Sequence, residues 1–246
     1  MTSVHDAAAR REELSNGLAK VQERIDAACR AAGRPREDVQ LIVVTKYFPG
    51  ADIEVLCERG VTDIGESRDQ EASAKIAALP EDVRARLHVH FIGQLQSNKA
   101  GSVAGYADTV HSIDRDKLVL ALDRAATAAG REVGALIQVR LDGGSPGRGR
   151  GGIPLDQAAQ VAGIADKIAA ARHLCLRGLM AVAPVGVDPV KAFAQLGTVA
   201  RSLRAEHPHA TWISAGMSAD LEAAVANGAT HLRVGSAILG SRPPFG

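Results

Sequence analysis

The sequence predicts an α/β fold, a single (β/α)8 barrel of the TIM type with one helix before the first strand. Strand-like runs alternate with helical patterns, which indicates a parallel sheet. Eight such units follow one another within 246 residues, a length that suits one barrel. Because no Pro/Ser-rich linker or shift in composition interrupts them, we expect one domain over residues 1–246.

The first expected element is an amphipathic helix over residues 3–32. Its apolar positions recur at steps of three and four residues, at Leu14, Leu18, Val21, Ile25 and Ala28. Gly33 and Pro35 end the pattern, since both residues favour helix termination.

The barrel elements are expected from residue 40 onwards. Short apolar runs predict strands at 40–45, 61–65, 87–93, 108–112, 135–141, 174–180, 210–214 and 231–235. Helices are expected between them at 52–59, 68–79, 96–105, 115–129, 155–171, 189–206 and 218–227, and a last short turn at 236–240.

Composition excludes several classes of function. The formal net charge of +1 and an aromatic content of 3% argue against a nucleic-acid binder, which would need a basic surface and exposed rings. No apolar run reaches membrane-spanning length, and the N-terminus lacks the apolar segment of a signal peptide. Cys29, Cys57 and Cys175 form no CxxC pair, which is typical of a reducing compartment. We therefore expect a cytoplasmic protein.

Two further motifs suggest other sites only weakly. "GRGRGG" (147–152) matches a dinucleotide fingerprint, but no acidic residue lies in the next strand and Pro146 breaks the tight turn. A flexible glycine loop with solvated Arg148 and Arg150 is the favoured interpretation. His88 and His90 share a strand face and could bind zinc with His111, yet no cysteine or carboxylate cluster accompanies them. Histidines that line a packed or polar pocket are favoured instead.

Chemistry in such barrels lies at the carboxyl ends of the strands. Lys46 follows the strand "LIVVT", where a desolvated amine could act as a nucleophile toward a carbonyl group. A lysine at a strand end is more often a surface residue, so Lys46 alone decides nothing.

Three other strand exits carry candidate ligand groups. Ser214, Gly216 and Ser218 follow the seventh strand, and Gly235 and Ser236 follow the eighth, where barrels often bind phosphate. The alternative is that Ser218 and Ser236 simply cap their helices. Arg233 shares a strand face with Gly235 and is expected to point into the barrel, where a ring nitrogen is one candidate acceptor.

The exit of the third strand is "GQLQSNK" (93–99). Gly93, Gln94 and Asn98 could supply amide donors there, with a capped helix start at Ser97 as the alternative. Together, a lysine amine, a phosphate cradle and an arginine inside the barrel form a hypothesis of a pyridoxal 5′-phosphate site.

At these residues the sequence resembles the YggS/PROSC family of pyridoxal phosphate homeostasis proteins. The resemblance spans nearly the whole chain and is carried by "VVTKYFP", "DIGES", "HFIGQLQSNK", "HSID", "RGLMAV", "GMSADLEAA" and "RVGSAILG". It implies an alanine-racemase-type barrel that holds pyridoxal phosphate as an aldimine on Lys46. It also implies that Arg233 contacts the ring nitrogen, that Ser214, Gly235 and Ser236 hold the phosphate, and that Met217 and Ser218 line the same loop.

The chain departs from the family pattern in three places. Ser67 stands where asparagine is usual, Tyr47 is an unusual neighbour of the lysine, and loop 143–152 is richer in glycine and arginine. None of these departures affects Lys46, Arg233 or the Gly235–Ser236 pair.

The resemblance implies a carrier that buffers or delivers the cofactor, with PLP-dependent apo-enzymes as expected partners. An arginine keeps the ring nitrogen unprotonated and so makes the ring a weak electron sink. The chain ends at Gly246 after the last barrel unit, so we expect no second domain to supply a racemase base, and a monomer. A weak PLP-dependent amino-acid racemase or lyase is the alternative function.

Overall fold

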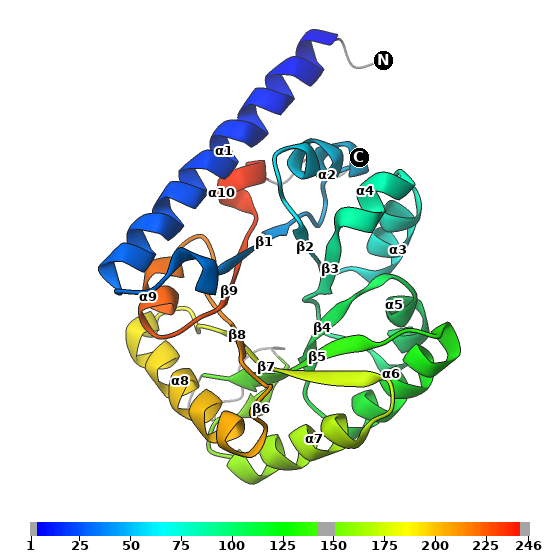
Figure 1. The fold of residues 1–246 in the computed structure, drawn as a ribbon, viewed down its shortest axis with the longest axis vertical. Helices are drawn as coiled ribbons and strands as arrows, with labels where there is room; N and C mark the ends of the chain where they lie inside the picture. Colours follow the sequence, from blue (N-terminus) through cyan, green and yellow to red (C-terminus); the bar gives the residue numbers. More distant parts are fainter. Residues whose placement is uncertain (1–3, 142–150, 242–246) are drawn as a thin grey trace.

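The computed structural model describes residues 4–141 and 151–241. In these residues parallel strands form a closed barrel surrounded by helices (Figure 1). The pairing order around the barrel is β1-β2-β3-β4-β5-β7-β8-β9, and β9 pairs with β1 to close it. The predicted (β/α)8 barrel and its N-terminal helix are therefore confirmed.

The strands lie close to their predicted positions. They are β1 (Gln40–Val44), β2 (Asp63–Glu66), β3 (His88–Phe91), β4 (Thr109–Ile113), β5 (Val133–Arg140), β6 (Ile153–Pro154), β7 (Leu174–Val182), β8 (Trp212–Ser214) and β9 (His231–Val234). Strand β6 was not predicted, because two residues are too few to show any periodicity. It pairs only with the carboxyl end of β5 and lies outside the closed ring.

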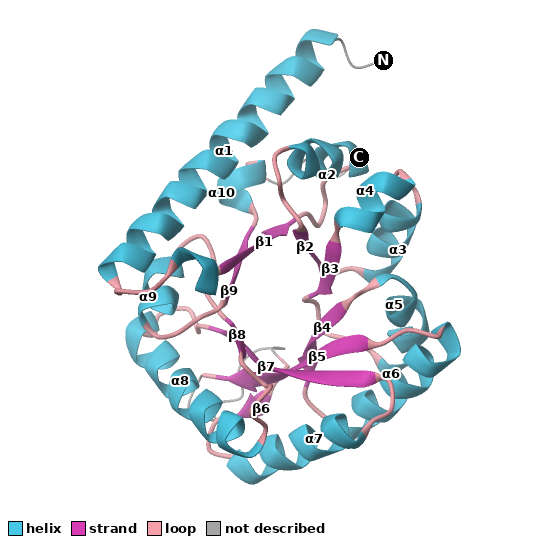
Figure 2. Cartoon of the chain, in the orientation of Figure 1, coloured by secondary structure: helices cyan, strands magenta, loops and turns pink. Residues whose placement is uncertain are grey.

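The helices surround the barrel, as Figure 2 shows. They are α1 (Val4–Ala31), α2 (Gly50–Glu58), α3 (Asp69–Ala77), α4 (Glu81–Arg86), α5 (Ala100–Tyr106), α6 (Asp116–Ala129), α7 (Ala158–Ala170), α8 (Pro189–Glu206), α9 (Leu221–Ala226) and α10 (Ser236–Leu239), with the 3-10 turns η1 (Arg36–Asp38) and η2 (Ser97–Lys99). Helix α4 was missed because Pro80 starts a new helix of only six residues. Among the described residues, no helix combines the length and the apolar character needed to cross a membrane.

Helix α1 packs along the outside of the barrel against α9 and α10 (Figure 1). Its predicted apolar face is buried, with Leu14 and Ile25 fully inaccessible. Gly17 allows the close approach, because a Cβ there would lie 2.5 Å from the carbonyl oxygen of Ile238. Helix α1 therefore supports α10, the short helix that begins at Ser236.

The barrel interior is polar at its centre. His90, His111, Ser214 and Arg233 are buried, although they are polar or charged. His111 on β4 contacts Ser214 on β8, and since these strands are not neighbours the contact runs across the interior. Apolar side chains such as Leu41 and Val43 belong to the hydrophobic core instead.

We expect Gly178→Ala to destabilise the barrel strongly. Gly178 follows a bulge in β7, has a φ of 149°, and a Cβ there would lie 1.9 Å from the carbonyl oxygen of Trp212. Because the obstacle is backbone, we expect a loss of about 3 kcal/mol in the free energy of unfolding. Urea denaturation would measure it.

Gly163→Ala in α7 is the matched control. A Cβ at Gly163 would have no atom within 4 Å, so the substitution should be neutral or stabilise by about 0.5–1 kcal/mol. Equal stability of the Gly178→Ala variant and the native chain would contradict the steric argument.

Candidate functional site

The predicted site residues lie at the carboxyl end of the barrel. Lys46 follows β1, Asn98 lies in η2 after β3, Met217 and Ser218 follow β8, and Gly235 follows β9. Because all these strands are parallel, their exits open at the same mouth.

Lys46 lies in a tight turn. The amide of Phe48 donates to the carbonyl oxygen of Thr45 at 3.1 Å, and Tyr47 has a φ of 72°, which is rare for a residue with a side chain. The amide of Tyr47 donates to Glu71 Oε1 at 2.5 Å, which helps to hold this conformation. Lys46 Nζ lies 5.9 Å from the centre of the Tyr47 ring, so Tyr47 faces the lysine amine.

A buried ionic network supports this turn from behind. Lys75 Nζ donates to Thr45 O at 2.9 Å, to Glu66 Oε1 at 2.8 Å and to Glu71 Oε1 at 3.0 Å. Burial raises the pKa of Glu66, and the charge of Lys75 opposes that effect. This network was not predicted, although the carboxylate at the end of β2 and the helical spacing of Glu71 and Lys75 are signals in the sequence.

The lysines at this mouth differ in whether a carboxylate holds their amine. Lys75 is held by two carboxylates, and Lys99 lies 3.6 Å from Asp69. Lys46 is half-buried and makes no ion pair within residues 4–141 and 151–241. Among the described lysines at this mouth, Lys46 is therefore the one whose amine no carboxylate holds.

Arg233 points into the barrel, as its strand position predicted. Its Nη1 donates to Ser214 Oγ at 2.6 Å, and its Nη2 donates to Ala181 O at 2.8 Å. Burial lowers the pKa of Arg233 to about 10. Among the described side chains no carboxylate is ion-paired with Arg233, so the guanidinium group is suited to a neutral acceptor such as a ring nitrogen.

Ser218 and Ser236 bring two hydroxyl groups together from neighbouring strand exits, with their Oγ atoms 3.5 Å apart. Neither acts as a helix cap, because the N-cap residues of α9 and α10 are Asp220 and Gly235. Gly235 lies directly beside the end of β1, since a Cβ on it would be 3.0 Å from Val44 O. Met217 is exposed, and its amide donates to Asp220 Oδ1 at 2.6 Å.

Asn98 is exposed, and its side chain makes no hydrogen bond within the described part of the chain. The 3-10 turn that contains it has Gln96 as its N-cap, so the alternative that Ser97 caps a helix there was wrong. Ser67 is half-buried at the exit of β2 and its backbone packs against Gly93.

The glycine-rich motif is only partly visible. Gly147, Arg148, Gly149 and Arg150 lie outside the described residues, so the interpretation as a solvated loop stays a prediction. Gly152 donates its amide to Asp114 Oδ2 at 3.2 Å and leads into β6 rather than directly into a helix.

The three histidines weighed as zinc ligands occupy the barrel interior. His90 Nδ1 lies 2.8 Å from His111 Nε2, and His90 Nε2 lies 2.9 Å from Asp63 Oδ1. His88 Nε2 instead contacts Thr109 Oγ1 at 2.7 Å. Within the described chain, no three His, Cys, Asp or Glu side chains are placed to share a metal ion.

Known proteins resemble this chain along most of its length. Residues 17–243 match the alanine racemase N-terminal domain. Curated relatives named pyridoxal phosphate homeostasis protein are 44% identical in Corynebacterium glutamicum, over 91% of this chain and 99% of the relative, and 42% identical in Mycobacterium tuberculosis, over 95% and 94%. The relative in Escherichia coli is 35% identical over 94% of this chain and 97% of its own.

Solved structures of other proteins have the same fold as this chain. The structure of PipY from Synechococcus elongatus described as having PLP bound has a TM-score of 0.74 and 33% identity, and covers 92% of this chain and 100% of its own. An alanine racemase from Clostridium difficile shares the fold with a TM-score of 0.67 and 12% identity, over 92% of this chain and 57% of the racemase. By these matches the chain belongs to the pyridoxal phosphate homeostasis protein family, whose barrel is that of the alanine racemase N-terminal domain.

Proposed function

We propose that this chain binds pyridoxal 5′-phosphate at the carboxyl end of its barrel and acts in the homeostasis of that cofactor. The observation that carries the proposal is the amine of Lys46, which makes no ion pair among the described residues. The Lys75 network holds its turn at the mouth, beside the Gly235–Ser236 exit. The names of the relatives and the PLP-bound PipY structure support it.

The residues fit the parts of this cofactor. Lys46 would bond the aldehyde carbon with loss of water, and Arg233 would donate to the ring nitrogen. Gly235, Ser236, Ser218 and Met217 would surround the phosphate, and Asn98 would approach from the exit of β3. Ser214 Oγ is fully buried against Arg233, so we assign it to holding that arginine rather than to the phosphate directly.

The arrangement favours a carrier over an efficient catalyst. The cofactor supplies electron withdrawal most strongly when its ring nitrogen is protonated, and Arg233 donates there instead of accepting. Tyr106 is buried, and burial raises the pKa of its hydroxyl group, which disfavours a role as a base. Tyr47 faces Lys46 Nζ, and this observation keeps a weak racemase or lyase activity as the second candidate function.

We further infer delivery of the cofactor to PLP-dependent apo-enzymes, by a monomer in the cytoplasm. Support for delivery comes from apolar side chains near the cofactor mouth. Val185, Val187 and Val190 follow β7, Met217 follows β8, and all four are exposed. Because β7 and β8 are neighbouring strands, these exposed side chains offer apolar surface that a partner protein could cover.

A titration with pyridoxal phosphate tests the binding, because condensation with a lysine shifts the visible absorbance of the cofactor. We expect saturable binding, and reactivation of an apo-enzyme when the loaded chain is added to it. No spectral change at excess cofactor would overturn the proposal.

Single amino acids separate the two candidate functions. With the loaded chain we expect no loss of chirality or product formation at rates of about 1–1000 per second, which are usual for enzymes. Turnover in that range would favour the racemase or lyase, and its dependence on Tyr47 would be shown by Tyr47→Phe.

A further inference from the structure

A continuous chain of hydrogen bonds crosses the barrel interior. Arg233 Nη1 is 2.6 Å from Ser214 Oγ, and Ser214 Oγ is 3.0 Å from His111 Nδ1. His111 Nε2 is 2.8 Å from His90 Nδ1, and His90 Nε2 is 2.9 Å from Asp63 Oδ1. The members come from β9, β8, β4, β3 and β2, and all but Asp63 are buried.

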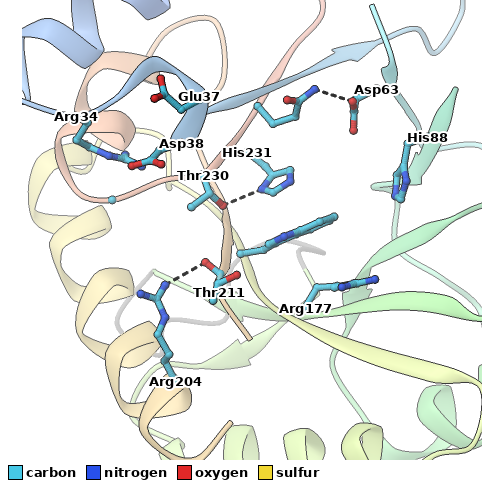
Figure 3. Close-up of a pocket in the computed structure, with 13 residues that line it drawn as sticks. Arg34, Glu37, Asp38, Asp63, His88, Arg177, Arg204, Thr211, Thr230 and His231 are labelled. Carbon is cyan, nitrogen blue, oxygen red and sulfur yellow. Dashed lines mark hydrogen bonds between the residues drawn. The ribbon is translucent and has the colours of Figure 1, made fainter. Parts of the chain in front are cut away.

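This chain of hydrogen bonds joins the two ends of the barrel. Arg233 belongs to the candidate cofactor site at the carboxyl end, whereas Asp63 begins β2 and lies at the opposite mouth. There Asp63 lines a cavity of about 860 Å³ together with His88, His231 and Arg177 (Figure 3). The exposed fraction of the Asp63 side chain is 14%, so this end of the chain is accessible from that mouth.

The two charged ends fix the direction of the outer bonds. A guanidinium group can only donate, so Ser214 Oγ accepts from Arg233. Asp63 accepts hydrogen bonds from His90 and Thr62, and although burial raises its pKa, these bonds bring the pKa below the usual value. Asp63 is therefore ionised and can only accept, so His90 Nε2 carries a proton.

If His90 and His111 are neutral imidazoles, each has one N–H, and the positions of the protons between the ends follow. Since His90 uses its N–H on Asp63, His90 Nδ1 accepts and His111 Nε2 donates. His111 Nδ1 then accepts, and the hydroxyl of Ser214 donates to it. Every bond in the chain is satisfied, with both histidines in the Nε2–H tautomer.

The surroundings keep His111 neutral. Burial lowers the pKa of His111 well below its usual value, and the positive charge of Arg233 would oppose a further cation. Two further histidines face His90. The ring centre of His88 lies 4.6 Å from that of His90, and the ring centre of His231 lies 6.2 Å from it. Burial lowers the pKa of both, so neither brings a charge close to the chain.

We propose that Ser214, His111 and His90 are positioning residues that hold Arg233 as a fixed donor toward the cofactor site and connect it to Asp63 at the far mouth. Arg233 makes no ion pair among the described residues. Asp220 attracts its charge from a distance, and the hydrogen-bond chain links Arg233 to a second carboxylate, Asp63. The bond from Nη2 to Ala181 O fixes the plane of the guanidinium group from a second side. The role toward the cofactor rests on the proposed function, whereas the proton order does not.

Nitrogen-15 NMR of the histidine side chains, in the protein without cofactor, tests the proposed positions of the protons. At neutral pH we expect His90 and His111 both as neutral Nε2–H tautomers. A doubly protonated His90, or an Nδ1–H tautomer at either residue, would overturn the order.

Asp63→Asn should reverse the donors and acceptors in the hydrogen-bond chain, although the substitution lies at the far mouth. Asp63 Oδ2 accepts from Gln40 Nε2 and Thr62 Oγ1, both at 2.6 Å, so the asparagine oxygen will stay there. Its NH2 group then donates to His90 Nε2, which forces both histidines into the Nδ1–H tautomer. Asp38→Asn is the matched control, since Asp38 lines the same cavity, is exposed and makes no bond to the chain. It should leave both tautomers unchanged.

The loaded protein gives the second readout. Asp63→Asn removes the anion that the hydrogen bonds link to Arg233. The substitution should therefore weaken pyridoxal phosphate binding on the order of tenfold and shift the absorbance of the bound cofactor. Reversed tautomers with unchanged affinity and spectrum would overturn the positioning role. A third outcome is that the native protein has the expected tautomers but binds no cofactor. This outcome would contradict the proposed function and leave the proton order supported.

Discussion

Lys46→Ala is expected to abolish the visible absorbance that the native chain acquires with pyridoxal phosphate. The covalent bond is lost with the amine, while the groups around the ring and phosphate remain. We expect residual binding at least about a hundredfold weaker, which corresponds to about 2.8 kcal/mol. Equilibrium dialysis would measure it.

Lys99→Ala is the matched control for this loss. Lys99 lies at the same mouth but pairs with Asp69 at 3.6 Å, so its removal should preserve the absorbance. Borohydride reduction of the native complex followed by mass spectrometry should place the label on Lys46. A label on Lys75, or absorbance retained in Lys46→Ala, would show that the anchor was misassigned.

Acid should destabilise the fold well above the range in which carboxylates titrate. Burial lowers the pKa of His231 to about 3 and that of His111 well below its usual value. Below pH of about 6.5 the unfolded chain therefore binds protons that the folded chain does not, so the free energy of unfolding falls as the pH falls. From pH 6.5 to 5 the two histidines together should cost about 3 kcal/mol.

Two carboxylates modify this slope differently. Burial raises the pKa of Glu66, so the folded chain gains stability from Glu66 as the pH falls, which partly offsets the histidines. Asp63 has a lowered pKa and loses its contribution only below its ordinary value of 3.8. The loss between pH 6.5 and 5 is therefore a histidine effect.

Urea unfolding at pH 7 and pH 5 would measure the slope. His231→Gln should reduce the loss between these pH values by about 1.5 kcal/mol. His209→Gln should leave it unchanged, because His209 is exposed. A stability that is flat over this range would contradict the neutral, buried state of these histidines.

Much of the molecule follows from local pattern in the sequence. The alternation of strands and helices predicted the barrel, since each element carries its own period of apolar residues. Alternation along a strand also placed Arg233 inside, and strand exits located Lys46, Gly235 and Ser236 at one mouth. Elements too short for a period, such as β6 and α4, could not be found in this way.

What only the tertiary structure decided is which side chains are paired. Lys46, Lys75 and Lys99 look alike in sequence. Their surroundings differ because Glu66 and Asp69, from other elements, form ion pairs with Lys75 and Lys99. His90 and His111 were read as ligands or pocket residues, and their connection to Arg233 depends on β3, β4, β8 and β9 facing one another across the closed barrel. Hydrogen bonds depend on positions in space, and these long-range partners have no periodic signal along the chain.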